Sequence, residues 1–129
     1  MRMFKGIFVA MACFSLLLLP SLQSDSLAGC PTTPVQIDGA FHPEVATAYP
    51  GVSPVQAAYN YASNELARAT FTLKLSGEIF TEDLDLNGGN VTFDGGYDDC
   101  TFTTKTSTTG MFGTMTIGSG SANFAGGIG

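Results

Sequence analysis

The stretch LDLNGGNVTFDGG, residues 84–96, recurs as MTIGSGSANFAGG, residues 115–127, thirty-one positions further along the chain. Each copy consists of two short segments in which apolar and polar residues alternate, joined by a glycine-rich corner and closed by Gly-Gly. A repeated unit of this size cannot bury its apolar face by itself. It buries this face by stacking on the neighbouring unit. The repeat therefore predicts a stacked β-architecture.

The first 28 residues have the layout of a secretory signal peptide. Arg2 and Lys5 form a short positive region, and residues 6–19 are an almost unbroken apolar run that ends at Pro20. Such a run is shorter than a comfortable membrane-spanning helix, and its flanks are those of a cleaved export signal. We therefore expect an exported protein that is secreted, periplasmic or located at the cell surface.

Two processing routes compete at the end of this signal, where residues 27–30 read LAGC. In the first route, a peptidase cleaves after Ala28 and Gly29 becomes the new N-terminus. In the second, LAGC, which resembles the lipobox of bacterial lipoproteins, directs acylation of Cys30 and anchoring in the outer membrane. Polar residues at 23 and 25 separate LAGC from the apolar run, which favours the first route.

Removal of the signal leaves two cysteines, Cys30 and Cys100. An even pair in an oxidising compartment is most simply a disulfide. This bridge would close a loop of roughly 70 residues, which contributes about 4 kcal/mol in the chain-entropy model. Acylation of Cys30 excludes the bridge and leaves Cys100 as a single thiol, so the two routes exclude each other.

The exported part has about 100 residues, which suffices for one small domain with a modest core. Its basic side chains are Arg68, Lys74 and Lys105, against ten aspartates and glutamates. Nucleic acid and anionic lipid both require clustered lysine and arginine. We therefore expect no nucleic-acid partner, and no membrane association after signal removal unless Cys30 carries a lipid.

The N-terminal part of the exported chain, residues 29–52, is predicted to be irregular apart from a short strand at 35–37. A helix is predicted over residues 54–69, because Ser53 and Gln56 form a capping box and Pro54 suits the first helical position. Apolar residues at helical spacing predict one buried face; they are Val55, Ala58, Tyr59, Ala62, Leu66 and Ala69. We expect this helix to cap one end of the β-stack.

The apolar period changes to two from residue 70, as in strands with one buried face. Strands are predicted at 71–76, 79–80, 84–86 and 91–93, followed by a polar excursion over 98–109 and the second copy of the repeat. Short strands with glycine corners favour a parallel β-helix. Residues 53–129 are therefore predicted to be mainly β, a capping helix followed by β-helix-like coils. The alternative is a small antiparallel β-sandwich with one helix.

Four segments carry a family resemblance: VQAAY (55–59), FTEDLDLN (80–87), VTFDGGYD (91–98) and GTMTI (113–117). In this order they resemble the N-terminal cap and first coils of right-handed parallel β-helix proteins of the pectate-lyase-like class. More narrowly, residues 30–129 are similar to a module of secreted bacterial surface proteins of unknown function. Members often pair a cysteine placed soon after Gly-Gly-Tyr-Asp with one just behind the signal, so the resemblance implies a Cys30–Cys100 disulfide.

Seven carboxylates fall between residues 78 and 99. Calcium favours oxygen clusters of this kind, and the resemblance is to a class whose lyases use calcium. The sequence contains no EF-hand or nonapeptide calcium pattern, and alternation divides these acids between two strand faces. Solvated faces and turns are therefore expected, with Asp94, Asp98 and Asp99 as the remaining calcium candidates. We predict no cofactor and no catalytic residue.

Two functional classes fit these observations. The first is a non-catalytic cell-envelope or secreted module with a structural or interaction role. The second, implied by the resemblance, is a shortened or degenerate carbohydrate-active enzyme of the pectate-lyase-like class. Lyases need a base beside the acids, and only Lys74 and Lys105 lie near them in the sequence, which favours the non-catalytic class.

The final coil is expected to lack a cap. Nothing after residues 124–127 is predicted to cover it, so Met115, Ile117 and Phe124 would face water or a partner. We therefore expect self-association, or docking onto another envelope protein, through this coil.

Overall fold

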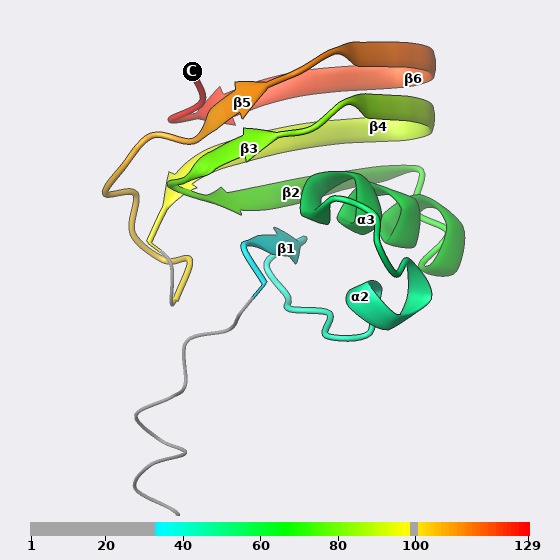
Figure 1. The fold of residues 1–129 in the computed structure, drawn as a ribbon, viewed down its shortest axis with the longest axis horizontal. Helices are drawn as coiled ribbons and strands as arrows, with labels where there is room; N and C mark the ends of the chain where they lie inside the picture. Colours follow the sequence, from blue (N-terminus) through cyan, green and yellow to red (C-terminus); the bar gives the residue numbers. More distant parts are fainter. Residues whose placement is uncertain (1–32, 99–100) are drawn as a thin grey trace, which may run out of the picture. The chain divides into compact units, whose positions relative to one another are not determined.

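Strands make up most of the fold, which a computed structural model describes for residues 33–98 and 101–129 (Figure 1). The elements are β1 (Val35–Ile37), α2 (Val45–Ala48), α3 (Pro54–Asn60), a π-helical turn η1 (Tyr61–Glu65), β2 (Thr70–Ser76), β3 (Ile79–Thr81), β4 (Leu84–Tyr97), β5 (Gly110–Phe112) and β6 (Met115–Gly126). The mainly β class predicted from the sequence is confirmed. The short strand expected at 35–37 is present, and the segment expected to be irregular also contains α2.

The strands form two sheets in which most neighbours run parallel. The larger sheet has the order β1-β2-β4-β6, with β1 antiparallel to β2 and the other neighbours parallel. In the smaller sheet β3 pairs with β5, also in parallel. The antiparallel sandwich that the sequence left open is therefore not the observed pairing. The larger sheet is mixed and the two sheets do not close, so the pairing establishes stacked parallel strands without a closed β-helix.

The sequence repeat corresponds to the register of the longest strand pairing, that between β4 and β6. Leu84 lies opposite Met115 and Phe93 lies opposite Phe124, each pair separated by the repeat length. The two phenylalanine rings are stacked, with their centroids 5.4 Å apart. The second copy of the repeat therefore lies directly on the first.

The glycine corner of the repeat is where this register shifts, between Leu86 and Asn90. Gly120 has a φ of 85°, a conformation that side chains disfavour. A Cβ at this position would collide with the carbonyl oxygen of Gly89 in the layer beneath. Glycine is thus required at this corner by its backbone conformation and by the close approach of two layers.

Alternate side chains of β2 and β4 form the core, as the period of two predicts. No member of this set is more than 3% exposed: Phe71, Leu73, Leu75, Leu84, Leu86, Val91 and Phe93. Helix α3 packs against β1, β2 and β4. It adds Val55 and Tyr59 to this core, and η1 adds Ala62. The predicted buried face of the helix is confirmed for these three residues and for Ala58, which is 2% exposed.

The predicted helix is too long at its C-terminal end. Regular α-helix ends at Asn60, one π-helical turn follows to Glu65, and Ala67 has a φ of 50°, which ends helical geometry. As a result Leu66 is half-buried and Ala69 is exposed, contrary to the prediction for both. Leu66 still packs at the border of the core.

The polar excursion after β4 returns to the end of that strand. The N–H groups of Thr106 and Ser107 donate to the carbonyl oxygen of Gly96, at 3.0 and 3.2 Å. Phe102 is 2% exposed, with its ring centroid 5.3 Å from that of Phe41 and 6.0 Å from that of Tyr97. One buried aromatic residue, Phe102, thus anchors the segment predicted from the sequence to be a polar excursion.

Candidate functional site

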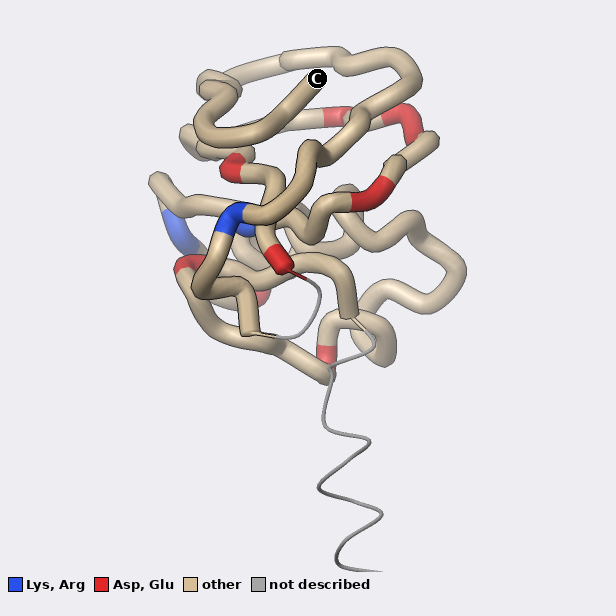
Figure 2. Tube along the Cα trace, turned by 90° about the vertical axis from the view of Figure 1, so that its left-hand side faces the viewer, with Lys and Arg blue, Asp and Glu red and all other residues tan. Residues whose placement is uncertain are grey.

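The layer formed by β5 and β6 is the outermost layer of the stack. Among the described residues, β6 pairs only with β4, so its far edge is free. The outer edge of β5 is partly covered by the C-terminal residues, because the N–H of Met111 donates to the carbonyl oxygen of Gly129 at 3.2 Å. Phe112 is 60% exposed, Ile117 47% and Phe124 55%, whereas Met115 is half-buried. Figure 2 shows this end of the trace without acidic or basic residues, and residues 106–129 contain no charged side chain.

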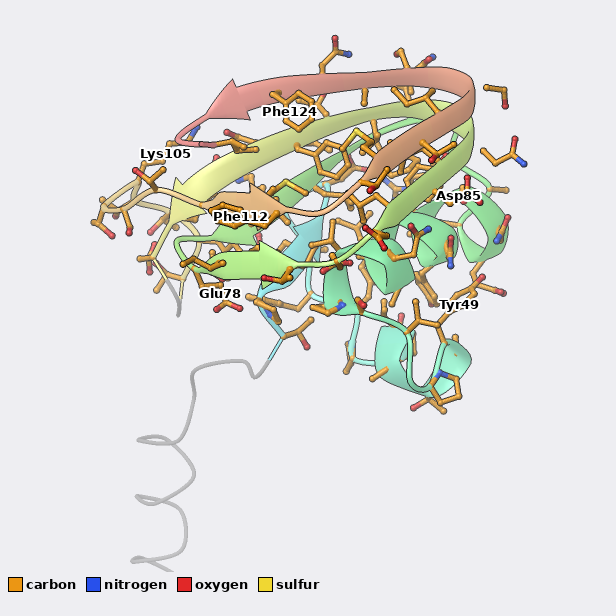
Figure 3. All side chains as sticks on the ribbon, turned by 45° about the horizontal axis from the view of Figure 1, so that its top comes forward. Tyr49, Glu78, Asp85, Lys105, Phe112 and Phe124 are labelled. Carbon is orange, nitrogen blue, oxygen red and sulfur yellow. The ribbon has the colours of Figure 1, made fainter. Side chains whose placement is uncertain are left out.

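An apolar hollow of about 480 Å³ lies in this layer. It is lined by Glu82, Leu84, Met111, Phe112, Gly113, Thr114, Met115, Phe124, Ile128 and Gly129. Phe112 on β5 and Phe124 on β6 both lie in this outer layer (Figure 3). The expected exposure of Ile117 and Phe124 is thus observed, and the hollow offers apolar contact rather than polar chemistry.

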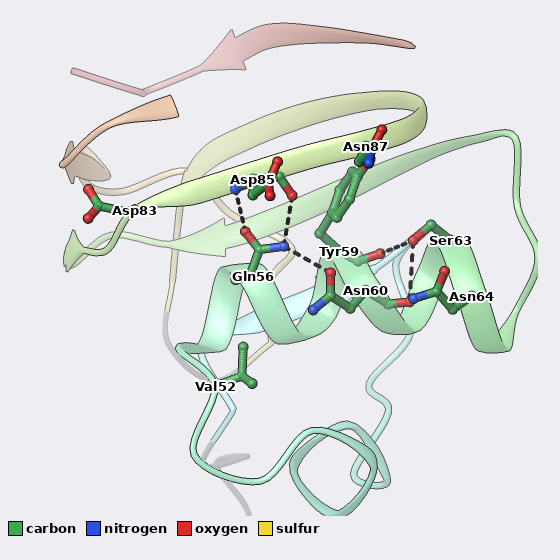
Figure 4. A pocket seen from close by; sticks show the side chains of 9 residues that line it. All are labelled: Val52, Gln56, Tyr59, Asn60, Ser63, Asn64, Asp83, Asp85 and Asn87. Atoms are coloured by element: carbon green, nitrogen blue, oxygen red, sulfur yellow. Dashed lines mark hydrogen bonds between the residues drawn. The ribbon is translucent and has the colours of Figure 1, made fainter. Parts of the chain in front are cut away.

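A second, polar hollow of about 470 Å³ lies beside α3 (Figure 4). It is lined by Val52, Gln56, Tyr59, Asn60, Ser63, Asn64, Asp83, Asp85 and Asn87. The amide of Gln56 accepts from the backbone N–H of Asp85 at 2.7 Å and donates to the Asp85 carbonyl at 3.0 Å. The hydroxyl of Tyr59 donates to the carbonyl oxygen of Gly88. The polar side chains of this hollow therefore connect helix α3 to strand β4 by hydrogen bonds.

The N-terminus of α3 is capped by Glu82, from the corner between β3 and β4. Its carboxylate accepts from the N–H groups of Val55 and Gln56, at 3.3 and 2.9 Å. Within the described chain, the Ser53 side chain makes no capping hydrogen bond. Ser53 thus occupies the predicted cap position, but the predicted capping box is replaced by a tertiary contact.

Asp94 lies in a small network with two cationic neighbours. Its carboxylate accepts from the Lys105 ammonium at 2.5 Å and from the Tyr97 hydroxyl at 2.6 Å. Two lysines lie near the Tyr97 ring, with Lys74 Nζ at 4.9 Å and Lys105 Nζ at 5.0 Å from its centroid. These contacts attach the excursion to the face of the sheet.

The protonation states in this network favour the ion pair. Burial raises the pKa of Asp94, but the hydrogen bonds from Lys105 and Tyr97 outweigh burial, so the pKa is lowered overall. The hydrogen bond from Lys105 to Asp94 raises the pKa of Lys105. The hydrogen bond from Tyr97 to Asp94, together with burial, raises the pKa of Tyr97. Lys105 is therefore held protonated and Asp94 ionised.

Asp98 organises the start of the excursion. Its carboxylate accepts from the Thr101 hydroxyl at 2.7 Å and from the N–H groups of Thr101, Thr103 and Thr104 at 2.9 to 3.1 Å. The Thr101 hydroxyl, followed by these backbone donors, holds the pKa of Asp98 well below its usual range. The carboxylate is thus used to fix a turn.

The residues predicted as a calcium site have separate structural roles. Asp94 pairs with Lys105 and Asp98 accepts from its own turn, while Asp99 lies outside the described residues. Across residues 33–98 and 101–129, no group of three or more His, Cys, Asp or Glu is arranged to hold a metal ion. Cys30, Cys100, the cleavage site at Ala28 and Gly29, and the signal peptide also lie outside the described residues.

Sequence reasoning missed the contacts that bring distant residues together. Glu82 and Gln56 are 26 positions apart in the sequence, and Asp94 and Lys105 are eleven apart. Only the capping-box pattern pointed to Gln56, and it assigned Gln56 a different partner. His42 also proves to be partly enclosed: its Nδ1 lies 3.1 Å from the Glu44 carboxylate, and its Nε2 is buried without a partner among the described residues.

Comparison of this chain with protein-family models, with curated proteins and with solved structures returns no match. Among the helices of the described residues, none is long and apolar enough to cross a membrane.

Proposed function

We propose that this chain is the capped start of a right-handed parallel β-helix and serves as a non-catalytic exported module with a structural or interaction role. The observation that carries the proposal is the parallel, in-register ladder between β4 and β6, which repeats residue for residue over most of its length. The parallel pairing of β3 with β5 supports it further, because the same repeat length relates these strands.

The use of polar residues supports a non-catalytic role over the lyase alternative. Glu82 caps a helix, Asp98 fixes a turn and Asp94 is paired with Lys105. A lyase base must accept a proton from its substrate. Lys105 is a poor base in this setting, because its raised pKa and its bond to Asp94 keep it protonated.

Export is the second part of the proposal and rests on the signal-peptide layout of residues 1–28. The exported chain begins at Gly29, and Cys30 forms a disulfide with Cys100. A bridge of this span stabilises a small domain by restricting its unfolded state.

Intact mass of the chain recovered from the culture medium or periplasm of a bacterial host tests export and the disulfide. The expected mass begins at Gly29 and increases by two hydrogens on reduction of the disulfide. A diacylglycerol adduct on Cys30 would replace the disulfide by a lipid anchor, and an unprocessed chain in the cytoplasm would refute export. Cleavage of acidic polysaccharides that is lost in Lys105→Met would refute the non-catalytic role.

A further inference from the structure

The outermost layer has the inward-facing positions of a buried layer. In the layer beneath, no member of the inward set is more than 3% exposed: Phe80, Leu84, Leu86, Val91 and Phe93. Their register partners in the outer layer are Met111, Met115, Ile117, Ala122 and Phe124. Ile117 and Phe124 are about half exposed only because no described residue lies over them. The inward-facing apolar side chains of the outer layer are thus covered on one side only, by the layer beneath.

The strand edge of this layer is also open to pairing. β6 has twelve residues, and within the described chain its far edge has no partner strand. Soluble proteins commonly protect such edges with lysine or other charged residues, or with proline. Residues 106–129 contain neither a charged side chain nor a proline. Nothing in this segment therefore opposes the addition of another strand.

The chemistry of the edge selects its partner. An uncharged surface neither attracts a charged partner nor repels a copy of itself, although the whole chain has a net charge of −6. The pairing of β6 with β4, which is parallel, shows that the side chains of one copy of this repeat pack on those of another. A second copy of this chain offers such a strand with the required apolar inner face.

The two ends of the larger sheet restrict how copies can meet. At the other end lies β1, which has only three residues, accompanied by α2 and α3 (Figure 1). This end offers no match for the twelve-residue edge of β6, so head-to-tail stacking is unsuitable. A contact between two β6 edges is self-complementary and closes after two copies.

We propose, building on the function proposed above, that two copies of this chain form a symmetric dimer in which their β6 strands pair antiparallel. A twofold axis normal to the sheet produces this pairing and keeps both inner faces on the same side. Met115, Ile117 and Phe124 of each copy then contribute to one shared core. The contact covers the free strand edges and the apolar hollow together.

Sedimentation of the exported chain across the micromolar range tests the dimer. A monomer–dimer equilibrium is expected, and Phe124→Lys should raise its dissociation constant by about tenfold or more, because it places like charges across the twofold axis. Val52→Lys is the matched control. It replaces another exposed apolar residue, 40% exposed beside α3, and should leave the equilibrium unchanged.

A second variant and a second measurement guard against misfolding, since the ring of Phe124 stacks on Phe93. Ile117→Lys should weaken the dimer in the same way, and hydrogen exchange of β6 amides should slow as the wild-type concentration rises. A cooperatively folding monomer at all concentrations would overturn the dimer and leave the exported module intact. Open-ended filaments, or equal effects of Phe124→Lys and Val52→Lys, would also overturn it.

Discussion

Thr109 is the residue whose replacement tests the stacking of this fold most directly. Its side chain is fully buried at the end of the excursion. The hydroxyl oxygen accepts from the backbone N–H of Gly96, at the end of β4, at 2.8 Å. It donates to the carbonyl oxygen of Ser76, at the end of β2, at 2.7 Å. One hydroxyl group therefore connects two strands and the segment that leads to the next layer.

The expected cost of Thr109→Val follows from the partners that are left behind. Valine has nearly the shape of threonine, so no cavity forms. The Ser76 carbonyl keeps a second donor, the N–H of Glu78 at 2.9 Å. The buried N–H of Gly96 loses its acceptor, which costs about 1–3 kcal/mol of unfolding free energy. For a domain of this size, each kcal/mol lowers the melting temperature by roughly 4–8 °C.

Urea denaturation of wild type, Thr109→Val and Thr109→Ser measures this cost. The serine variant keeps both hydrogen bonds and loses one methyl group, so it should lose about 0.8 kcal/mol. Hydrogen exchange of the Gly96 amide should accelerate in the valine variant and remain slow in the serine variant. If valine proved as stable as threonine, with the Gly96 amide still protected, the hydroxyl would not connect these layers.

Two further predictions concern the carboxylates. Glu82→Ala should lower the unfolding free energy by about 1 kcal/mol, because it removes the acceptor at the start of α3; urea denaturation should show no such loss for Glu78→Ala, an exposed neighbour. Asp98 has a lowered pKa in the folded state, so its carboxylate stabilises the fold above its unfolded pKa of about 3.9, and this contribution is lost as the pH falls below that value. The acid-induced drop in stability should therefore be shallower in Asp98→Asn, and an unchanged drop would contradict the role assigned to this turn.

The parts of the fold that were predictable from the sequence are those in which local pattern and long-range contact coincide. The repeat gave the register of β4 and β6, because stacking places identical positions above one another. The alternation in β2 gave its buried side chains. The end of the helix was misjudged because apolar spacing continues to Ala69, whereas the backbone leaves helical geometry at Ala67.

The polar contacts were beyond sequence reasoning for a physical reason. A carboxylate can accept from a helix terminus, a lysine or a backbone turn, and only the fold decides which donor is near. Asp94 and Asp98 are four positions apart on the same segment, yet one pairs with Lys105 and the other with its own turn. Composition described both as members of one acidic cluster and could not separate their roles.

The two margins of the stack differ in how their backbone groups are satisfied. At Asp85 the side-chain amide of Gln56 supplies one donor and one acceptor, the same pair that a neighbouring strand would supply. Helix α3 therefore takes the place of a strand beside the first part of β4, whereas β2 pairs with β4 from Asn90 onward. In the outer layer the register partner of Asp85 is Thr116, and beyond it the described chain has no side chain in an equivalent place. Among the described residues no side-chain amide takes this position beside β6, so strand pairing ends beside the helix and remains available at β6.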